Sequence, residues 1–200
     1  MKNSKIKNLN TGYTIIETMI SVSLFIIVMM AGMGALLNAN LLHQKSQDMR
    51  SIMDNLSFIM EDMSRNLRTG YNYRCLTGED TLSSVVSPLS CASGWGIAFE
   101  TADGSTSNAN DQWVYYIDGN GKILKSVQGP YIASAFVQLT PNEVIIDQLS
   151  AFSVLGAEGI ANNAEQPLVS IRLVGRIILR NDVITPFSLQ TSVSQRLVDI

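Results

Sequence analysis

The residue with the clearest chemical role is Glu17, a lone carboxylate at the edge of a long uncharged segment. The nearest basic residues on either side are Lys7 and Lys45, and Thr18 to Gln44 is a run of 27 residues without a charge. A carboxylate at the edge of a membrane-spanning helix is costly unless a partner neutralises it. We therefore expect Glu17 either to lie among lipid headgroups or to pair with a cationic group of another molecule.

The two cysteines, Cys75 and Cys91, lie 16 positions apart. In an extracytoplasmic domain such a pair predicts a disulfide, and closing a loop of this length contributes about 3 kcal/mol in the chain-entropy description. Two buried free thiols are the alternative. A metal site is not expected at these cysteines, because there is no C-x-x-C motif and the single histidine, His43, lies far away in the sequence.

A second group of polar residues is rich in oxygen atoms, as a calcium site requires. It contains Asp103, Ser105, Ser107, Asn108, Asn110 and Asp111. Polar loops of this composition are usually solvated turns, so Asp103 and Asp111 are weak calcium candidates and no cofactor is expected.

Catalysis and nucleic-acid binding are both disfavoured. With one histidine in the chain there is no obvious nucleophile and base pair, and the sequence has no G-x-S-x-G, P-loop or H-E-x-x-H motif. The chain has 14 basic and 17 acidic residues and a net charge of -3, which is a poor basis for binding a polyanion. We expect neither an enzyme nor a nucleic-acid partner.

Glu17 is followed by an apolar segment that is long enough to cross a membrane. Residues 19–37, at about 1.5 Å per residue in a helix, can span a hydrocarbon core of roughly 30 Å. Lysines precede this segment and few follow it directly, so the positive-inside rule places the N-terminus in the cytoplasm. The segment is a cleaved secretory signal, a single-span anchor, or the part retained after a leader is cut on the cytoplasmic side. A secretory signal would need cleavage near Gly32 and Gly34, where the small-x-small pattern is mediocre.

The residues from Gly12 to Ile20, Gly-Tyr-Thr-Ile-Ile-Glu-Thr-Met-Ile, resemble the processing site of type IV pilin-like proteins, which include type II secretion pseudopilins. The resemblance implies that a prepilin peptidase removes residues 1–12 by cutting after Gly12, and that the new N-terminus at Tyr13 is N-methylated. The family usually has Phe where this chain has Tyr13. It also implies that Glu17 pairs with the terminal amine of a neighbouring subunit during filament assembly. An amine and a carboxylate neutralise one another well in a low-dielectric helix bundle.

The apolar pattern continues as an amphipathic helix. Between Asn38 and Leu67 apolar residues recur at helical spacing, at Leu42, Met49, Ile52, Met53, Leu56, Ile59, Met60, Met63 and Leu67. No proline interrupts the segment, and Gly70 predicts its end. The sequence thus predicts one helix from about Thr14 to Thr69. Gly32 and Gly34 each lower helix propensity by about 1 kcal/mol, so we expect bending or local melting there.

From Tyr71 onward the pattern indicates β-strands. Residues 95–100 form one candidate, and 112–117 with 123–127 form a hairpin across a Gly-rich turn. Near the C-terminus, residues 169–179 and 187–194 alternate apolar and polar, which predicts two antiparallel strands with one buried face. We therefore expect an α+β, pilin-like fold in which a helix over 13–69, with membrane-spanning (13–37) and amphipathic (38–69) parts, precedes one antiparallel sheet domain over 70–200.

The C-terminal strand sequences also resemble those of minor pilins and minor pseudopilins of the J and W types. The similar strings are those at 149–154, 166–171 and 188–196. The two resemblances imply a structural subunit of a type IV pilus or type II secretion pseudopilus, at the filament tip or in priming. Implied partners are the prepilin peptidase, other pilin or pseudopilin subunits, the inner-membrane assembly platform and the lipid bilayer. The competing class is an extracytoplasmic binding protein whose helix is only an anchor.

Overall fold

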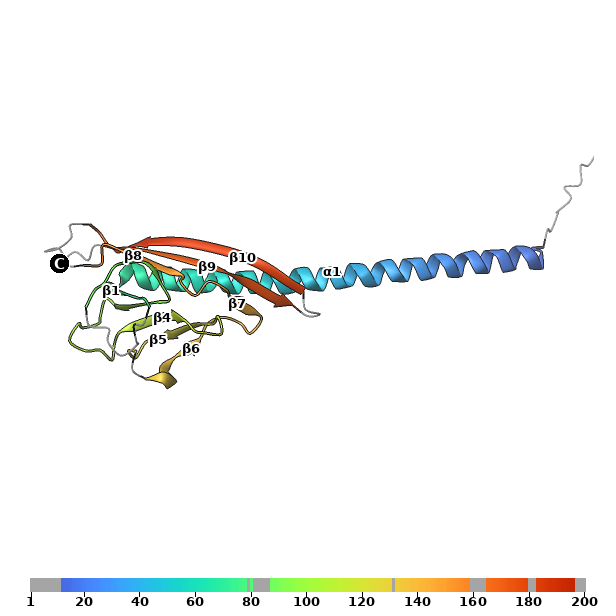
Figure 1. Ribbon diagram of the computed structural model, residues 1–200. Coiled ribbons are helices and arrows are strands. Elements are labelled where there is room, and N and C mark those ends of the chain that lie inside the picture. The colour runs from blue at the N-terminus through green and yellow to red at the C-terminus, as the bar shows by residue number, and fades with distance from the viewer. Residues whose placement is uncertain are drawn as a thin grey trace, which may run out of the picture. The chain divides into compact units, whose positions relative to one another are not determined.

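The computed structural model describes residues 12–78, 80, 87–130, 132–158, 165–179 and 183–196. A single long helix, α1 (Ile15–Thr69), precedes a region of short and long β-strands (Figure 1). The chain divides into two compact units, Met1–Gln47 and Asp48–Ile200, and α1 contributes residues to both. The expected α+β class, with one long N-terminal helix followed by antiparallel β-structure, is confirmed.

The helix begins and ends where local chemistry favours it. The Thr14 hydroxyl accepts the backbone N–H of Glu17 (3.3 Å), which satisfies one of the free donors of the first turn. At the other end, the buried Tyr73 hydroxyl shares its proton between the carbonyl oxygens of Leu67 (2.5 Å) and Gly70 (2.6 Å). A Cβ at Gly70, the residue that follows the helix, would overlap the ring of Phe99, so a glycine suits this position.

The β-region contains two five-stranded sheets rather than the single sheet expected from the sequence. The first has the order β1 (Tyr71–Leu76), β3 (Gly96–Glu100), β4 (Trp113–Ile117), β5 (Ile123–Ser126), β6 (Val137–Gln138). The second has the order β10 (Val183–Ser194), β9 (Leu168–Leu179), β8 (Phe152–Leu155), β2 (Cys91–Gly94), and β7 (Val144–Ile146) also pairs with β9. A short 3-10 helix, η1 (Ala133–Ala135), precedes β6.

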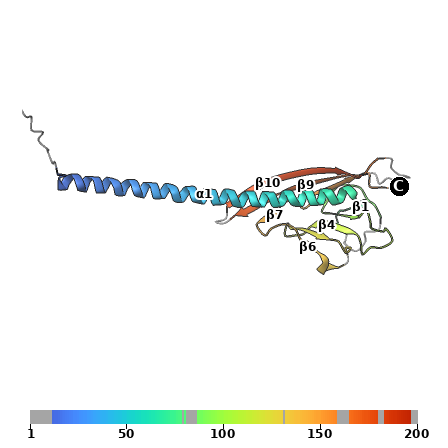
Figure 2. The ribbon, with the colours of Figure 1, turned by 180° about the vertical axis from the view of Figure 1, so that it is seen from behind.

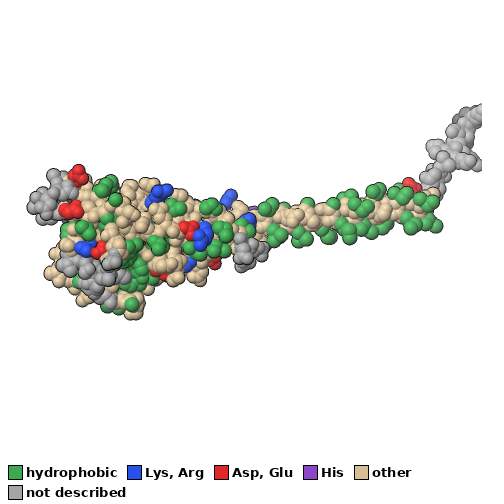
Figure 3. Space-filling model, in the orientation of Figure 1, with side chains coloured by type: hydrophobic (Ala, Val, Ile, Leu, Met, Phe, Trp, Pro, Cys, Tyr) green, Lys and Arg blue, Asp and Glu red, His purple; other side chains and the backbone are tan. Residues whose placement is uncertain are grey.

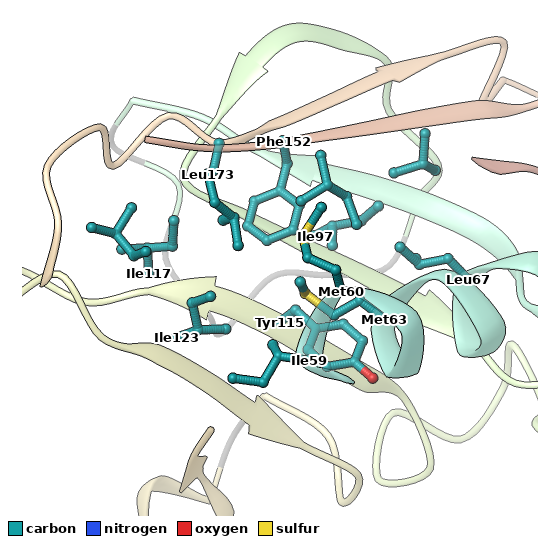
Figure 4. Packing of buried hydrophobic residues seen from close by; sticks show 14 of the residues in the cluster. Ile59, Met60, Met63, Leu67, Ile97, Tyr115, Ile117, Ile123, Phe152 and Leu173 are labelled. Carbon is teal, nitrogen blue, oxygen red and sulfur yellow. The ribbon is translucent and has the colours of Figure 1, made fainter. Parts of the chain in front are cut away.

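Both sheets pack on the C-terminal part of α1. In two opposite views, β9 and β10 lie on one side of this part of the helix and β4 to β6 on the other (Figures 1 and 2). The helix buries residues at three- and four-residue spacing, namely Ile52, Leu56, Ile59, Met60, Met63 and Leu67. Figure 4 shows Met60 and Met63 among side chains from both sheets, including Ile97 and Tyr115 from the first and Phe152 and Leu173 from the second.

The C-terminal hairpin confirms the predicted alternation. β9 and β10 pair in continuous register from Leu179 opposite Val183 to Leu168 opposite Ser194. The inward residues of β9 include the five apolar positions predicted to be buried, namely Val169, Ile171, Leu173, Ile177 and Leu179. The predicted hairpin of residues 112–127 is also confirmed, as β4 and β5. Of the predicted helix stripe, Leu42 is exposed, and it belongs to the first compact unit.

Candidate functional site

The first candidate site is the start of α1, where the residues of the predicted processing motif lie. Gly12 and Tyr13 are exposed and precede the first helical turn, and Glu17 is the third residue of α1. The order Thr14-Ile15-Ile16-Glu17 is that of a capping box, in which a threonine and a glutamate three positions later satisfy each other's backbone donors. The structure contains the half of this motif in which the Thr14 hydroxyl accepts the backbone N–H of Glu17.

Residues 18–37 of α1, which follow Glu17, expose their apolar side chains. The best 18-residue window of the helix has a mean hydropathy of 2.4 and no residue buried by the rest of the described chain. The first half of the helix is green with hydrophobic side chains in Figure 3. By length and composition this is a helix that can cross a membrane, and it is compatible with a single-pass anchor.

The hydroxyl groups in this segment do not conflict with an apolar environment. Thr18, Ser21 and Ser23 each donate to a backbone carbonyl three or four residues earlier, at 2.8 Å in every case. Such internal bonds leave no hydroxyl hydrogen without a partner in lipid. The segment is therefore suited to a membrane or to the interior of a helix bundle.

The helix is unbroken through Gly32 and Gly34, the two positions expected to bend or melt. A Cβ at either glycine would meet no other atom within 4 Å, so neither glycine is required by a close contact in the described chain. The flexibility expected of these residues stays a prediction. His43 also lies on this part of α1, where it is exposed and hydrogen-bonded to the side chain of Gln47 (3.0 Å).

The second site is the disulfide between Cys75 and Cys91, which confirms the predicted pairing. Cys75 belongs to β1 and Cys91 to β2, so the bond joins the two sheets, with their Cα atoms 5.9 Å apart. Gly94 packs directly against this bond, because a side chain there would overlap the sulfur of Cys75 and the carbonyl of Leu76. The role of the disulfide is thus structural, and it holds the sheets together near the end of α1.

The third site is the loop between β3 and β4, which carries the calcium candidates. Asp111 accepts the backbone N–H of Ser105 (3.2 Å) through one carboxylate oxygen, and Asp103 is exposed. The described residues contain no group of three or more His, Cys, Asp or Glu side chains that could hold a metal ion.

The sequence analysis missed the buried acid at the base of this loop. Glu100, the last residue of β3, has no exposed surface, and neither of its carboxylate oxygens has a hydrogen-bond donor in bonding geometry. Burial raises the pKa of Glu100, the amide of Gln112 opposes that shift, and the charge of Asp111 adds to it. Strand alternation could not reveal this residue, because all five residues of β3 are buried.

A polar cluster between α1 and the first sheet was also missed. Asp62 receives hydrogen bonds from the Lys125 ammonium (2.9 Å) and the Tyr115 hydroxyl (3.1 Å), and Asn66 donates to that hydroxyl (2.8 Å). The Lys125 nitrogen also lies 4.4 Å from the centre of the Trp113 ring, within cation–π range. The hydrogen-bonded pairs between helix and sheet join residues 49 to 63 positions apart along the chain, so only the folded structure brings them together.

Comparisons of the chain with protein-family models, with curated proteins and with solved structures found no match.

Proposed function

We propose that the chain is a pilin-like structural subunit that a prepilin peptidase processes after Gly12 and that assembles through α1 into a filament. The filament is a type IV pilus or a type II secretion pseudopilus, and the chain serves as a minor, tip or priming subunit. The observation that carries the proposal is a 27-residue uncharged helical run, fully exposed in the described chain, that directly follows Gly12-Tyr13 and Glu17. Cleavage after Gly12 is inferred from the resemblance of residues 12–20 to the processing site of type IV pilin-like proteins.

Assembly through the helix has a physical basis in the exposed apolar surface. Before assembly this surface lies in lipid, and in a filament it packs against the helices of other subunits. The terminal amine of Tyr13, freed by cleavage, and the Glu17 carboxylate of a neighbour neutralise one another in that low-dielectric setting. In this proposal the subunit first sits in the inner membrane with its N-terminus in the cytoplasm, and later in a periplasmic or surface filament.

The first test is mass spectrometry of the mature N-terminus from membranes of the native host. The expected chain begins at N-methylated Tyr13. An intact Met1 would favour the alternative, a single-span extracytoplasmic binding protein, which the exposed apolar helix supports equally well. A start beyond Gly34 would indicate a secreted soluble domain. Either of these results would remove the filament proposal.

The second test separates the two roles of Glu17, helix capping and charge pairing. Glutamine serves in a capping box as glutamate does, so Glu17→Gln retains the cap and removes the charge, whereas Thr14→Ala weakens the cap and retains the charge. We expect Glu17→Gln and Glu17→Ala to abolish filament assembly with normal membrane insertion, and Thr14→Ala to assemble. Normal assembly of Glu17→Gln would show that charge pairing is not the role of this residue.

A further inference from the structure

The base of the loop between β3 and β4 brings together buried carboxylate oxygens, beside which the Gln112 amide is the one side-chain group that favours the charged form of Glu100. Both carboxylate oxygens of Glu100 and the Oδ1 atom of Asp111 are buried without a hydrogen-bond partner. The Glu100 side chain points into the loop, because a Cβ built on Gly104 would lie 2.9 Å from its Oε2 atom. Tyr71 lies near both carboxylates, and its hydroxyl donates to the carbonyl oxygen of Gly104 (2.7 Å).

This arrangement is incomplete as it stands, because the fully buried carboxylate of Glu100 and one buried oxygen of the partly buried Asp111 lie together without a neutralising cation. No lysine or arginine among the described residues forms an ion pair with Glu100 or Asp111. Burying an unpaired carboxylate costs several kcal/mol, and a second carboxylate beside it adds repulsion. The buried oxygens therefore require a proton or a metal cation.

We propose that the carboxylates of Glu100 and Asp111 bind one calcium ion at the base of this loop. The two carboxylates supply oxygen ligands, and calcium accepts six to eight oxygen ligands in irregular geometry, including backbone carbonyls and water. Magnesium demands a near-ideal octahedron, which an irregular loop supplies less readily. The site does not depend on the proposed filament function, since it lies wholly within the unit Asp48–Ile200.

The affinity is expected to be modest. Two carboxylates supply fewer charges than the sites of intracellular calcium sensors, and extracellular modules with weaker sites bind with dissociation constants of about 0.1–1 mM. The candidates singled out from the sequence were Asp103 and Asp111. Of these two, only Asp111 belongs to the proposed site, and Asp103 is exposed. The second carboxylate of the site is that of Glu100.

The test is thermal unfolding of the full-length chain in detergent micelles, with the disulfide intact, after treatment with EGTA. We expect CaCl2 to raise the melting temperature by several degrees, with half of the effect at about 0.1–1 mM, and MgCl2 to have a much smaller effect. Calcium at 10 mM without any shift would overturn the proposal and leave a shared proton as the neutralising partner.

Two variants make the test specific to the site. Glu100→Gln keeps the shape of the side chain and removes its charge, so the calcium-dependent shift should disappear while the protein in EGTA remains folded. Asp103→Asn is the matched control, because this exposed carboxylate lies on the same loop outside the buried cluster, and it should keep the full shift. Retention of the shift in Glu100→Gln would contradict the assignment.

A direct binding measurement covers the case in which Glu100→Gln does not fold. Terbium(III) replaces calcium in oxygen sites and emits when a nearby tyrosine is excited. Wild-type chain should sensitise terbium emission, calcium should compete it away, and Tyr71→Phe should reduce it. Emission that calcium does not compete, or that is equal in Tyr71→Phe, would count against a site beside Tyr71.

Discussion

At the scale of single residues, Asp62 is the strongest polar link between α1 and the first sheet. Its carboxylate interacts with Lys125 and Tyr115, and although burial alone would raise its pKa, the hydrogen bonds and the charge of Lys125 lower it overall. Both partners of the ion pair are partly shielded, with side chains 17% and 33% exposed. This pair is therefore worth more than an ion pair on the open surface.

Replacing Lys125 by methionine should lower the free energy of unfolding by about 1–2 kcal/mol, because Asp62 then lies half-buried without its cation. Arg65→Ala is the matched control. Its ion pair with Glu61 lies on the same helix with side chains 74% and 68% exposed. Its loss should cost less than about 0.5 kcal/mol. Urea denaturation of the two variants measures the difference, and equal effects would show that the buried network adds nothing.

Glu100 makes a distinct prediction for the pH dependence of stability in EGTA. Burial raises the pKa of Glu100 above its ordinary value of 4.5 in the folded state. As pH rises past 4.5, the folded chain therefore keeps this proton longer than the unfolded chain does. The contribution of this group to stability is thus largest below about pH 4.5 and is lost as pH rises through the folded pKa. The free energy of unfolding should therefore fall over that range, and Glu100→Gln should reduce the fall. An unchanged pH profile in Glu100→Gln would contradict this account.

At the scale of elements, the C-terminal hairpin is formed by β9 and β10. Among the described residues β10 pairs only with β9, so its other edge is free. The backbone hydrogen bonds of β9 show which residues of β10 direct their N–H groups to this edge. In β9, the backbone N–H groups of Arg172 and Ile178 bond to Ala151 and Glu143, on the side away from β10. The backbone N–H and C=O groups of the even-numbered residues of β9 thus point toward β7 and β8. Those of its odd-numbered residues point toward β10. By the register of the hairpin, the even-numbered residues of β10 direct their backbone groups to the free edge.

Proline should therefore be tolerated at one position of β10 and not at the next. Pro186 already occupies an even-numbered position, where no hairpin hydrogen bond is lost. Gln190→Pro should lower the free energy of unfolding by less than about 1 kcal/mol, and Thr191→Pro by about 3 kcal/mol or more, because the latter removes a bond to β9. Thermal unfolding of the two variants measures this, and equal destabilisation would show that the assigned bond directions are wrong.

The disulfide between the sheets makes a second prediction at this scale. Replacing both Cys75 and Cys91 by alanine should lower the free energy of unfolding by about 3 kcal/mol. Gly94→Ala, which places a methyl group against the bond, should cost about 1–3 kcal/mol with the disulfide present. Gly119→Ala is its control, because a side chain there would meet no atom within 4 Å. Similar losses in the two glycine variants would contradict the close packing at Gly94.

At the scale of the whole molecule, the two units differ in how much apolar surface they bury. Residues 48–200 bury a continuous core formed by α1 and both sheets, whereas the apolar side chains of residues 13–37 are exposed. Expressed without the first unit, residues 48–200 should fold as a water-soluble protein with an intact disulfide and unfold cooperatively. The full chain should require detergent for extraction. Insolubility or non-cooperative unfolding of the shorter chain would show that the second unit depends on the first.

Elements whose apolar residues recur at a regular spacing could be predicted from the sequence alone. The helix of Ile15–Thr69, its buried stripe from Ile52 to Leu67, and the alternation of β9 and β10 were all predictable, because burial on one face imposes a fixed spacing on apolar residues. The cysteine pairing was predictable from the even count, on the expectation that the domain is extracytoplasmic.

The division of the strands between two sheets and the contacts between polar groups could not be predicted from the sequence, because they depend on the three-dimensional fold. β1 and β2 carry the two cysteines but belong to different sheets, and strand alternation does not encode strand partners. The Asp62–Lys125 pair joins residues 63 positions apart, and Glu100 is buried within a strand that is buried on both faces. Contacts of this kind depend on which surfaces meet in three dimensions, and spacing along one chain holds no record of that.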